Sequence, residues 1–460
     1  MKKRFYSRIG AAALALVLAL QSPGTIPSLL AADTSDQMVS EPEVVAVETY
    51  GDTGVRSMDF DSNWKFYLGD ASGAESEVYD DSSWSQVNLP HDYSIEQDTT
   101  KSGEAESGYR LGGIGWYRKH FVVEKNMEGK ELRIDFGGVY MNATVWINGV
   151  QLGTHPYGYT PFSFDITDYV KFGQDNVLTV KVNHQTPSSR WYSGSGIYRS
   201  VKLTATEPVH VDLYGTKITT PNLETEKGGI VNMTVKTTVA NAGDTAAEVV
   251  LKHTIFKKDT DTSIGTVTTA AQSVASGDVA EISATLQANN PDLWSVDAPN
   301  LYTVVTEVKV ADNVVDTYET DYGFRYFKFD ADTGFSLNGE NMKLKGVCMH
   351  HDQGSLGSEA YYRAIERQVE ILKEMGCNSI RVTHNPAADE LIEACNKHGI
   401  LLIEEIFDGW ERPKNGNSQD YSKWFNVVIE DGNQILGAED SMTWAQFDMT
   451  ATVNRGYNAP

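Results

Sequence analysis

The sequence NSIRVTHNP at residues 378–386 is followed by GILLIEE at residues 399–405. Each is a short apolar run bounded by polar residues, which is typical of a buried strand, and residues 387–397 between them have the apolar spacing of a helix. Upstream, MKLKGVCMHH (342–351) has the pattern of a strand and residues 358–375 that of a helix. Strands that alternate with helices predict a parallel sheet with right-handed crossovers.

Polar residues gather at the end of each predicted strand. Because the carboxyl ends of parallel strands meet at one edge of a sheet, we expect these side chains to lie close together, on the face that carries the active site in α/β barrels. They are His350, His351 and Asp352, then Arg381, Thr383 and His384, then Glu404, Glu405 and Asp408.

Two regions of a different pattern precede this unit. Residues 57–206 contain short alternating runs broken by Gly, Asn, Asp and Pro, which favour a β-sandwich or jelly roll. Residues 207–326 repeat the alternation with fewer aromatic residues, and predict a second, smaller, immunoglobulin-like sandwich. We therefore expect two β domains followed by an α/β unit at residues 327–460.

The N-terminus has the layout of a secretory signal peptide. Basic residues precede an apolar run that is too short to span a bilayer, and we expect residues 1–32 to be removed on export to the cell exterior or surface. The polar, acidic stretch at residues 33–56 is interpreted as a flexible leader. No membrane span is expected in the mature chain.

The composition restricts the partners. The 460 residues include 38 Lys and Arg against 63 Asp and Glu, and the net charge of −25 would repel nucleic acid. Only 3 cysteines are present, so we expect no disulfide framework and a stability that comes from burial.

With these motifs, the sequence resembles glycoside hydrolase family 2, the family of β-galactosidases, β-glucuronidases and β-mannosidases. Residues 378–386 are similar to the family signature N-x-x-R-x-x-H-x-P, with the next strand in place. Supporting similarities are LPHDYSIE (89–96), RWYSGSGIYRSV (190–201) and FSLNGENMKLKGVCMHHD (335–352). The resemblance covers residues 58–460.

The resemblance implies a jelly-roll sugar-binding domain, an immunoglobulin-like sandwich and the first strands of a (β/α)8 TIM barrel. It favours an exported retaining β-galactosidase of carbohydrate catabolism, whose substrate is a β-galactoside or a related oligosaccharide. The alternatives are a β-glucuronidase or β-mannosidase of the same family, or a carbohydrate-binding module that catalyses nothing.

The resemblance also implies which side chains meet the sugar. Arg381 corresponds to an arginine beside the nucleophile, and His350 and His384 to histidines that contact sugar hydroxyls. Loops of the first domain would bring further contacts, and a tryptophan after the third strand could stack on the sugar face. For Asp92 and Trp191, a turn aspartate and a buried tryptophan are equally open interpretations. The predicted substrate-binding set is Asp92, Arg190, Trp191, His350, Arg381, His384 and Trp410.

The catalytic residues of the family are two glutamates on the barrel. A complete barrel needs about 250 residues, about twice the length of residues 327–460. We therefore expect the acid/base and the nucleophile to lie beyond Pro460 and this chain to be inactive alone. Glu404 and Glu405 cannot replace them, because adjacent strand residues point to opposite faces and retaining hydrolysis needs two carboxyls about 5–5.5 Å apart.

Metal binding and oligomeric state stay open at this stage. His350 and His351 could suggest a metal, but no compatible third ligand follows at a known spacing. Some members of the family use Mg²⁺ or Na⁺, so the resemblance leaves either ion possible without assigning ligands.

Overall fold

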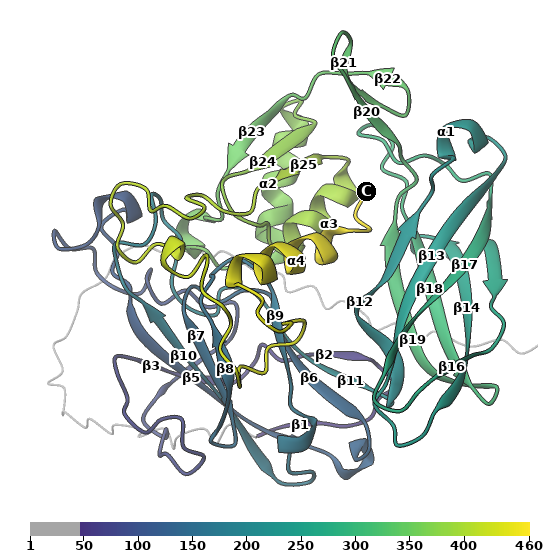
Figure 1. Cartoon of the computed structure of the whole chain (residues 1–460). Helices are drawn as coiled ribbons and strands as arrows, with labels where there is room; N and C mark the ends of the chain where they lie inside the picture. Colours follow the sequence, from purple (N-terminus) through teal and green to yellow (C-terminus); the bar gives the residue numbers. More distant parts are fainter. Residues whose placement is uncertain (1–46) are drawn as a thin grey trace, which may run out of the picture. The chain divides into compact units, whose positions relative to one another are not determined.

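The computed structural model describes residues 47–460 (Figure 1). The predicted signal peptide at residues 1–32, and the part of the predicted leader before Val47, lie outside the described residues. Among the described helices, none has the length and apolar character needed to cross a membrane.

The end of the predicted leader belongs to the first sandwich, which corrects the expectation of a flexible segment as far as residue 56. Glu48–Tyr50 form strand β1, which pairs in parallel with β5 (Gly113–Val123), and Tyr50 is buried. The ammonium of Lys119, itself without exposed surface, donates to Glu48 Oε2 at 2.6 Å. A strand of three residues is too short to show the alternation of apolar and polar residues that predicts a strand. Its contacts with β5 and Lys119 explain why it forms.

The first domain is a sandwich of a seven-stranded and a four-stranded sheet. Alternation fixes which face is inside: in β6, Leu132, Ile134 and Phe136 are buried while the residues between them are partly exposed. The first sheet contains β1, β3 (Trp64–Leu68), β4 (Ser85–Val87), β5, β7 (Ala143–Ile147), β8 (Val150–His155) and β10 (Asp175–His184); the second contains β2 (Ser57–Asp59), β6 (Glu131–Phe136), β9 (Phe162–Asp165) and β11 (Val201–Thr206).

The second domain is a smaller sandwich of a three-stranded and a five-stranded sheet, as the alternation predicts. One sheet contains β12 (Val209–Thr219), β13 (Ile230–Asn241) and β17 (Val279–Asn289); the other contains β14 (Ala247–Lys257), β15 (Ser263–Thr268), β16 (Gln272–Val274), β18 (Tyr302–Val310) and β19 (Asn313–Tyr322), and the short helix α1 (Leu223–Glu226) lies between β12 and β13.

The third region begins with the small antiparallel sheet of β20 (Phe327–Asp330), β21 (Gly334–Leu337) and β22 (Glu340–Asn341). A parallel sheet in the order β23-β24-β25 follows, and helices connect its strands (Figure 1). This βαβαβ arrangement is the start of a TIM barrel, as predicted. Its elements are β23 (Gly346–Met349), α2 (Tyr362–Glu374), β24 (Ser379–Val382), α3 (Asp389–His398) and β25 (Leu401–Glu404).

The turn between α3 and β25 depends on a glycine. Gly399 caps α3 in the left-handed region with φ 71°, and its backbone N–H donates to the carbonyl of Cys395. A Cβ at this position would lie 2.4 Å from the carbonyl oxygen of Val296 in the second sandwich. Only glycine allows both the cap and this close approach, so the start of β25 is fixed against the second domain.

Residues 405–460, which follow β25, contain a feature that the sequence pattern does not predict. After β25, an extended segment runs to helix α4 (Trp444–Gly456), and its apolar residues join the core of the first sandwich. Ile435 forms a bridge with Phe164 at the edge of β9, and the N–H of Leu436 donates to the carbonyl of Ser163. The segment therefore covers an edge of the four-stranded sheet.

Candidate functional site

The parallel register brings the predicted site residues of β23 and β24 to one edge. Cys348 pairs with Arg381, and Arg381 with Ile403, so these three residues share the face of the sheet opposite the helices. His350 and His384 follow at the ends of their strands. The expectation that the strand ends bring these polar side chains together is met for Arg381, His350 and His384.

Glu405 holds two of these side chains. Its Oε1 accepts from Arg381 Nε at 2.7 Å and lies 2.5 Å from Arg381 Nη2, while its Oε2 lies 2.6 Å from His384 Nδ1. Glu405 is two residues beyond Ile403 and so projects to the same face as Arg381. One carboxylate thus links an arginine and a histidine of the predicted set.

Trp191 of the first domain reaches this group. Its ring centroid lies 4.6 Å from that of His350 and 5.3 Å from that of His384. Burial lowers the pKa of His350 below its ordinary value, and the nearby charge of Arg190 acts in the same direction. Trp191 Nε1 and His350 Nδ1 are buried without a hydrogen-bond partner among the described atoms.

Arg190 is paired across the domain boundary with Asp408, which follows β25. Arg190 Nε donates to Asp408 Oδ2 at 3.0 Å, and Arg190 Nη2 donates to Asp408 Oδ1 in a bidentate pair. Lys414 Nζ approaches Asp408 Oδ1 at 3.4 Å. Burial alone would raise the pKa of Asp408, but the hydrogen bond and charge of Arg190 outweigh it and the pKa lies below the ordinary value.

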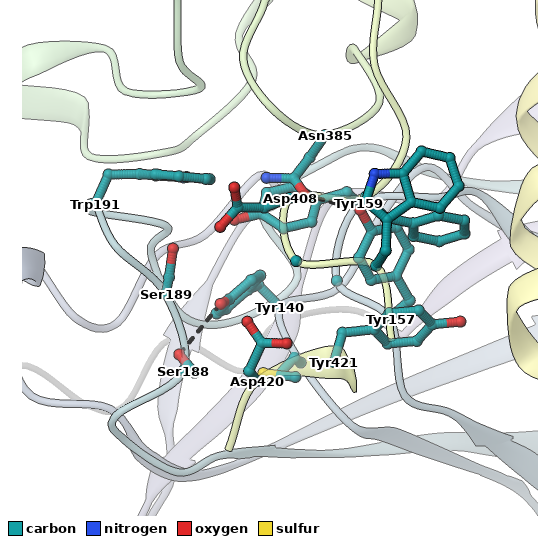
Figure 2. Close-up of a pocket in the computed structure, with 15 residues that line it drawn as sticks. Tyr140, Tyr157, Tyr159, Ser188, Ser189, Trp191, Asn385, Asp408, Asp420 and Tyr421 are labelled. Atoms are coloured by element: carbon teal, nitrogen blue, oxygen red, sulfur yellow. Dashed lines mark hydrogen bonds between the residues drawn. The ribbon is translucent and has the colours of Figure 1, made fainter. Parts of the chain in front are cut away.

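A cavity of about 30 Å³ lies beneath this pair, which is room for about one water molecule. Figure 2 shows side chains from the loop after β10 meeting those that follow β24 and β25 around it. Its polar and aromatic lining includes Tyr140, Tyr157, Tyr159, Ser188, Ser189, Trp191, Asn385, Asp408, Trp410, Asp420 and Tyr421.

Trp410 is placed at the rim. The residue is 55% exposed, and its backbone has φ 54°, in the left-handed region that a bulky residue rarely occupies. The ring packs against Phe407 at 5.7 Å and Phe425 at 6.3 Å, which holds one edge of the indole. An exposed, strained tryptophan beside polar groups is suited to stacking on a ligand.

Asp92 lies apart from this group, contrary to the predicted contact with sugar. It has no exposed surface. Its Oδ1 accepts from Ser94 N, Ser94 Oγ and Ser195 N at 2.6–3.0 Å, and its Oδ2 accepts from Ser358 N and Oγ at 2.9 and 3.0 Å and from Tyr192 OH. With both oxygens saturated, Asp92 ties the first domain to the loop after β23.

The adjacent glutamates at the end of β25 do not form a pair. Glu404 points to the other face, where its Oε1 accepts from Ala387 N at 3.0 Å and from Arg455 Nη2. Glu405 is occupied by Arg381 and His384. The geometry agrees with the prediction that these two carboxyls cannot flank one glycosidic bond.

Residues that the sequence does not single out support the strand ends. Tyr157 OH donates to the carbonyl of Ile406 and lies 2.8 Å from the Asn385 side-chain amide. Arg199 Nη2 donates to the carbonyl of Pro386 at 2.9 Å. Tyr157 and Arg199 belong to the first domain, and their tertiary contacts leave no signal in a sequence pattern.

A metal has no fitting set of ligands among the predicted site residues. In the described part of the chain, the group of three acidic or histidine side chains with ligand atoms within 4.8 Å is Glu366, Glu370 and His398, on α2 and α3. Arg363 and Lys397 already pair with these carboxylates at 2.8 Å. These pairs already neutralise the carboxylates of that group, and the Mg²⁺ or Na⁺ that the resemblance leaves open stays without assigned ligands.

Comparison with known proteins gives a consistent result. Three family models match successive parts of the chain: "Glycosyl hydrolases family 2, sugar binding domain" at residues 75–208, "Glycosyl hydrolases family 2" at 209–325 and "Glycosyl hydrolases family 2, TIM barrel domain" at 331–436. Together they follow the three structural regions.

Named relatives cover most of this chain but are longer. Beta-galactosidase BoGH2A of Bacteroides ovatus is 44% identical over 371 residues, which are 80% of this chain and 43% of that protein. A beta-glucuronidase of Formosa agariphila is 30% identical over 401 residues, 80% of this chain and 40% of that protein. The chain thus spans less than half the length of either relative.

A solved structure agrees in fold. The crystal structure of a glycosyl hydrolase family 2 member from Bacteroides cellulosilyticus aligns with a TM-score of 0.81 and 37% identity, covering 88% of this chain and 50% of that chain. With its sandwiches, its parallel strands and its signature residues in the order of the family, this chain belongs to glycosyl hydrolases family 2.

Proposed function

We propose that this chain forms the sugar-binding side of a retaining β-galactosidase, and that it holds the galactosyl residue of a β-galactoside at the carboxyl ends of β23, β24 and β25. Arg190, Trp191, His350, His384 and Trp410 supply hydrogen-bonding and stacking surfaces around one rim. Unpartnered Trp191 Nε1 and His350 Nδ1 support this proposal, because buried polar atoms are normally satisfied and a sugar hydroxyl could satisfy them.

The pairing of charged side chains in the site is the reason for proposing a galactoside rather than a glucuronide. Both arginines of the predicted set are already paired, Arg190 with Asp408 and Arg381 with Glu405. The carboxylate of a glucuronide would need an unpaired cation, whereas galactose needs only hydrogen-bond partners and an apolar face. The described residues therefore favour a neutral sugar over a uronic acid.

A β-glucuronidase remains the second candidate, because a relative of that name matches 80% of this chain at 30% identity. The two candidates differ in one charge on the ligand. A direct comparison of neutral and acidic ligands therefore separates them.

We also propose that the chain is exported and that it binds sugar without cleaving it when it is alone. Export is supported by the basic and apolar layout of residues 1–32. Of the four carboxylates at the strand ends, Glu404 is engaged by Arg455, Glu405 by Arg381 and Asp408 by Arg190, whereas Asp352 is exposed. No two of these four are free to act as the acid/base and nucleophile pair that retaining hydrolysis requires.

The test is calorimetric titration of the chain with isopropyl β-thiogalactoside and with phenyl β-thioglucuronide, together with an assay on nitrophenyl β-galactoside. We expect binding of the galactoside, at least tenfold weaker binding of the glucuronide, and no hydrolysis above the blank. His350→Ala should abolish binding, while the exposed control substitution Asp440→Asn should not. Preference for the glucuronide would reverse the choice of sugar, and binding of neither would contradict the proposal.

A further inference from the structure

Glu405 is placed where it can control both the geometry and the charge of the sugar-binding face. We propose that Glu405 is a positioning and specificity-determining residue: it holds Arg381 and His384 for a sugar, and its charge restricts the site to neutral sugars. This inference rests on the proposed function, since it concerns the same site.

The exposure of Arg381 and His384 is the first argument that Glu405 positions them. The side chains of Arg381 and His384 are 42% and 28% exposed, so packing alone does not immobilise them. Glu405 contacts Arg381 Nε and Nη2 through one oxygen and His384 Nδ1 through the other. Long side chains lose much rotamer freedom on binding a ligand, and a tether that removes this freedom beforehand strengthens binding.

The contact with His384 also sets which ring nitrogen faces a ligand. A carboxylate beside Nδ1 favours the proton on Nδ1. Nε2 is then left to meet a sugar hydroxyl as an acceptor, and the contact with the Trp191 ring at 5.3 Å restricts rotation of the imidazole. Glu405 thereby determines the hydrogen-bonding character of His384.

The charge of Glu405 has a separate effect. Paired with Glu405, the guanidinium of Arg381 attracts a further anion less than an unpaired guanidinium would, and a uronate carboxylate brought near would be repelled by Glu405. Without that negative charge, Arg381 would become a free cation beside the sugar. Loss of Glu405 should therefore weaken galactoside binding and strengthen glucuronide binding at once, which no general loss of structure would do.

Glu404 provides a matched control. It is the adjacent residue and has the same side chain, but its partners are Arg455 and Ala387 on the opposite face of β25. Glu404→Gln should lower stability, because Arg455 is buried, without changing which sugar is preferred.

The experiment compares the wild-type chain with Glu405→Gln, Glu405→Asp and Glu404→Gln by titration with the same thiogalactoside and thioglucuronide. For Glu405→Gln we expect about tenfold weaker galactoside binding, the scale of one charged hydrogen bond, and glucuronide binding at least as strong as galactoside binding. Glu405→Asp keeps the charge but shortens the reach, so it should lose galactoside affinity without gaining glucuronide affinity. An unchanged preference in Glu405→Gln, or the same change in Glu404→Gln, would overturn the inference.

A second measurement needs no ligand. In ¹⁵N-histidine spectra, with the His384 signals assigned from His384→Gln, we expect the Nδ1-protonated tautomer in the wild type and in Glu404→Gln, and a mixture in Glu405→Gln. If the wild type binds neither sugar but its tautomer depends on Glu405, the proposed function fails while the positioning holds. If the tautomer is identical in all variants, the positioning is wrong whatever binds.

Discussion

At the scale of single residues, Glu359 has a proton-binding behaviour that the surrounding contacts explain. It is half-buried at the boundary between the loop after β23 and the first domain, where its Oε1 accepts from Asp92 N at 3.3 Å. Burial raises the pKa of Glu359 from 4.5 to about 7; the Asp92 N–H opposes this, and the charges of Asp92 and Glu96 add to it. Between about pH 4.5 and 7, the Glu359 carboxyl is therefore protonated in the folded chain and ionised in the unfolded chain.

This predicts a pH dependence of stability. Because the folded pKa is raised, the stabilisation is fully present below about 4.5 and is lost as the pH rises through about 7. Glu359→Gln imitates the neutral form, so we expect it to match the wild type near pH 5 and to be more stable by about 1 kcal/mol at pH 8, a figure reduced for solvent screening. Urea unfolding at both pH values checks this, with the exposed Glu374→Gln as control; a difference independent of pH would contradict it.

The residues also show what a sequence can and cannot reveal about a site. Arg381, His384 and His350 could be predicted because a strand ends beside each of them, and strand ends are local. The burial of Asp92 could not, since it depends on Ser358, 266 positions away. The role of Glu405 was accessible in part: two-residue alternation places it on the face of Arg381, but not at 2.7 Å from its guanidinium.

At the scale of elements, α2, α3 and the three parallel strands were predictable, whereas α4 was not. In α2 the apolar residues Ile365 and Val369 recur at helical spacing and are buried, which is a local signal. In α4 the buried residues include Trp444, Phe447 and Asp448, a mixture with a weak apolar stripe. Helix α4 is stabilised by tertiary contacts and an N-terminal cap, and its apolar residues do not recur regularly enough for the sequence to predict it.

That cap gives a testable prediction. Thr443 Oγ1 accepts from Gln446 N at 3.4 Å, and the Gln446 side chain accepts in return from Thr443 N at 2.9 Å, which together form a capping box. Thr443→Ala should destabilise the chain by about 1 kcal/mol, while Thr443→Ser keeps the hydroxyl and should cost little. Equal denaturation midpoints for the alanine and serine variants would show that the box contributes nothing.

At the scale of the whole molecule, the C-terminal segment and the first sandwich share one core. Phe407, Tyr421, Trp444 and Phe447 belong to the same buried cluster as the sandwich interior. Asp448, which has no exposed surface, lies 2.8 Å from His155 Nε2 and accepts from Thr160 and Tyr421. The end of the chain is therefore structurally part of a domain that begins about 400 residues earlier.

This sharing predicts joint unfolding. We expect amides of α4 and of β9 to exchange hydrogen together, with similar protection, because opening one exposes the apolar surface of the other. Trp444→Ala should lower protection in both by the same factor, by removing a side chain of the shared core. Hydrogen exchange followed by mass spectrometry measures this, with the second sandwich as internal reference. Rapid exchange in α4 while β9 stays protected would show two independent units.

Helix α4 and the residues just after it are attached to both sandwiches, which restricts how the length of the helix can change. Asp448 fastens it to the first sandwich, and Asn458 just beyond its end fastens it to β12 of the second, accepting from Ile218 N at 2.9 Å and donating to the carbonyl of Thr216 at 2.6 Å. The helix rises about 1.5 Å per residue, so the helical residues between Asp448 and the end of α4 set the spacing of its two anchors. One inserted residue would lengthen the helix only slightly but would turn one anchor by about 100° relative to the other. The number of residues in α4 therefore fixes both the distance and the rotation between its two anchors. An insertion or deletion in α4 should disturb these contacts more than a substitution at a position that makes neither contact.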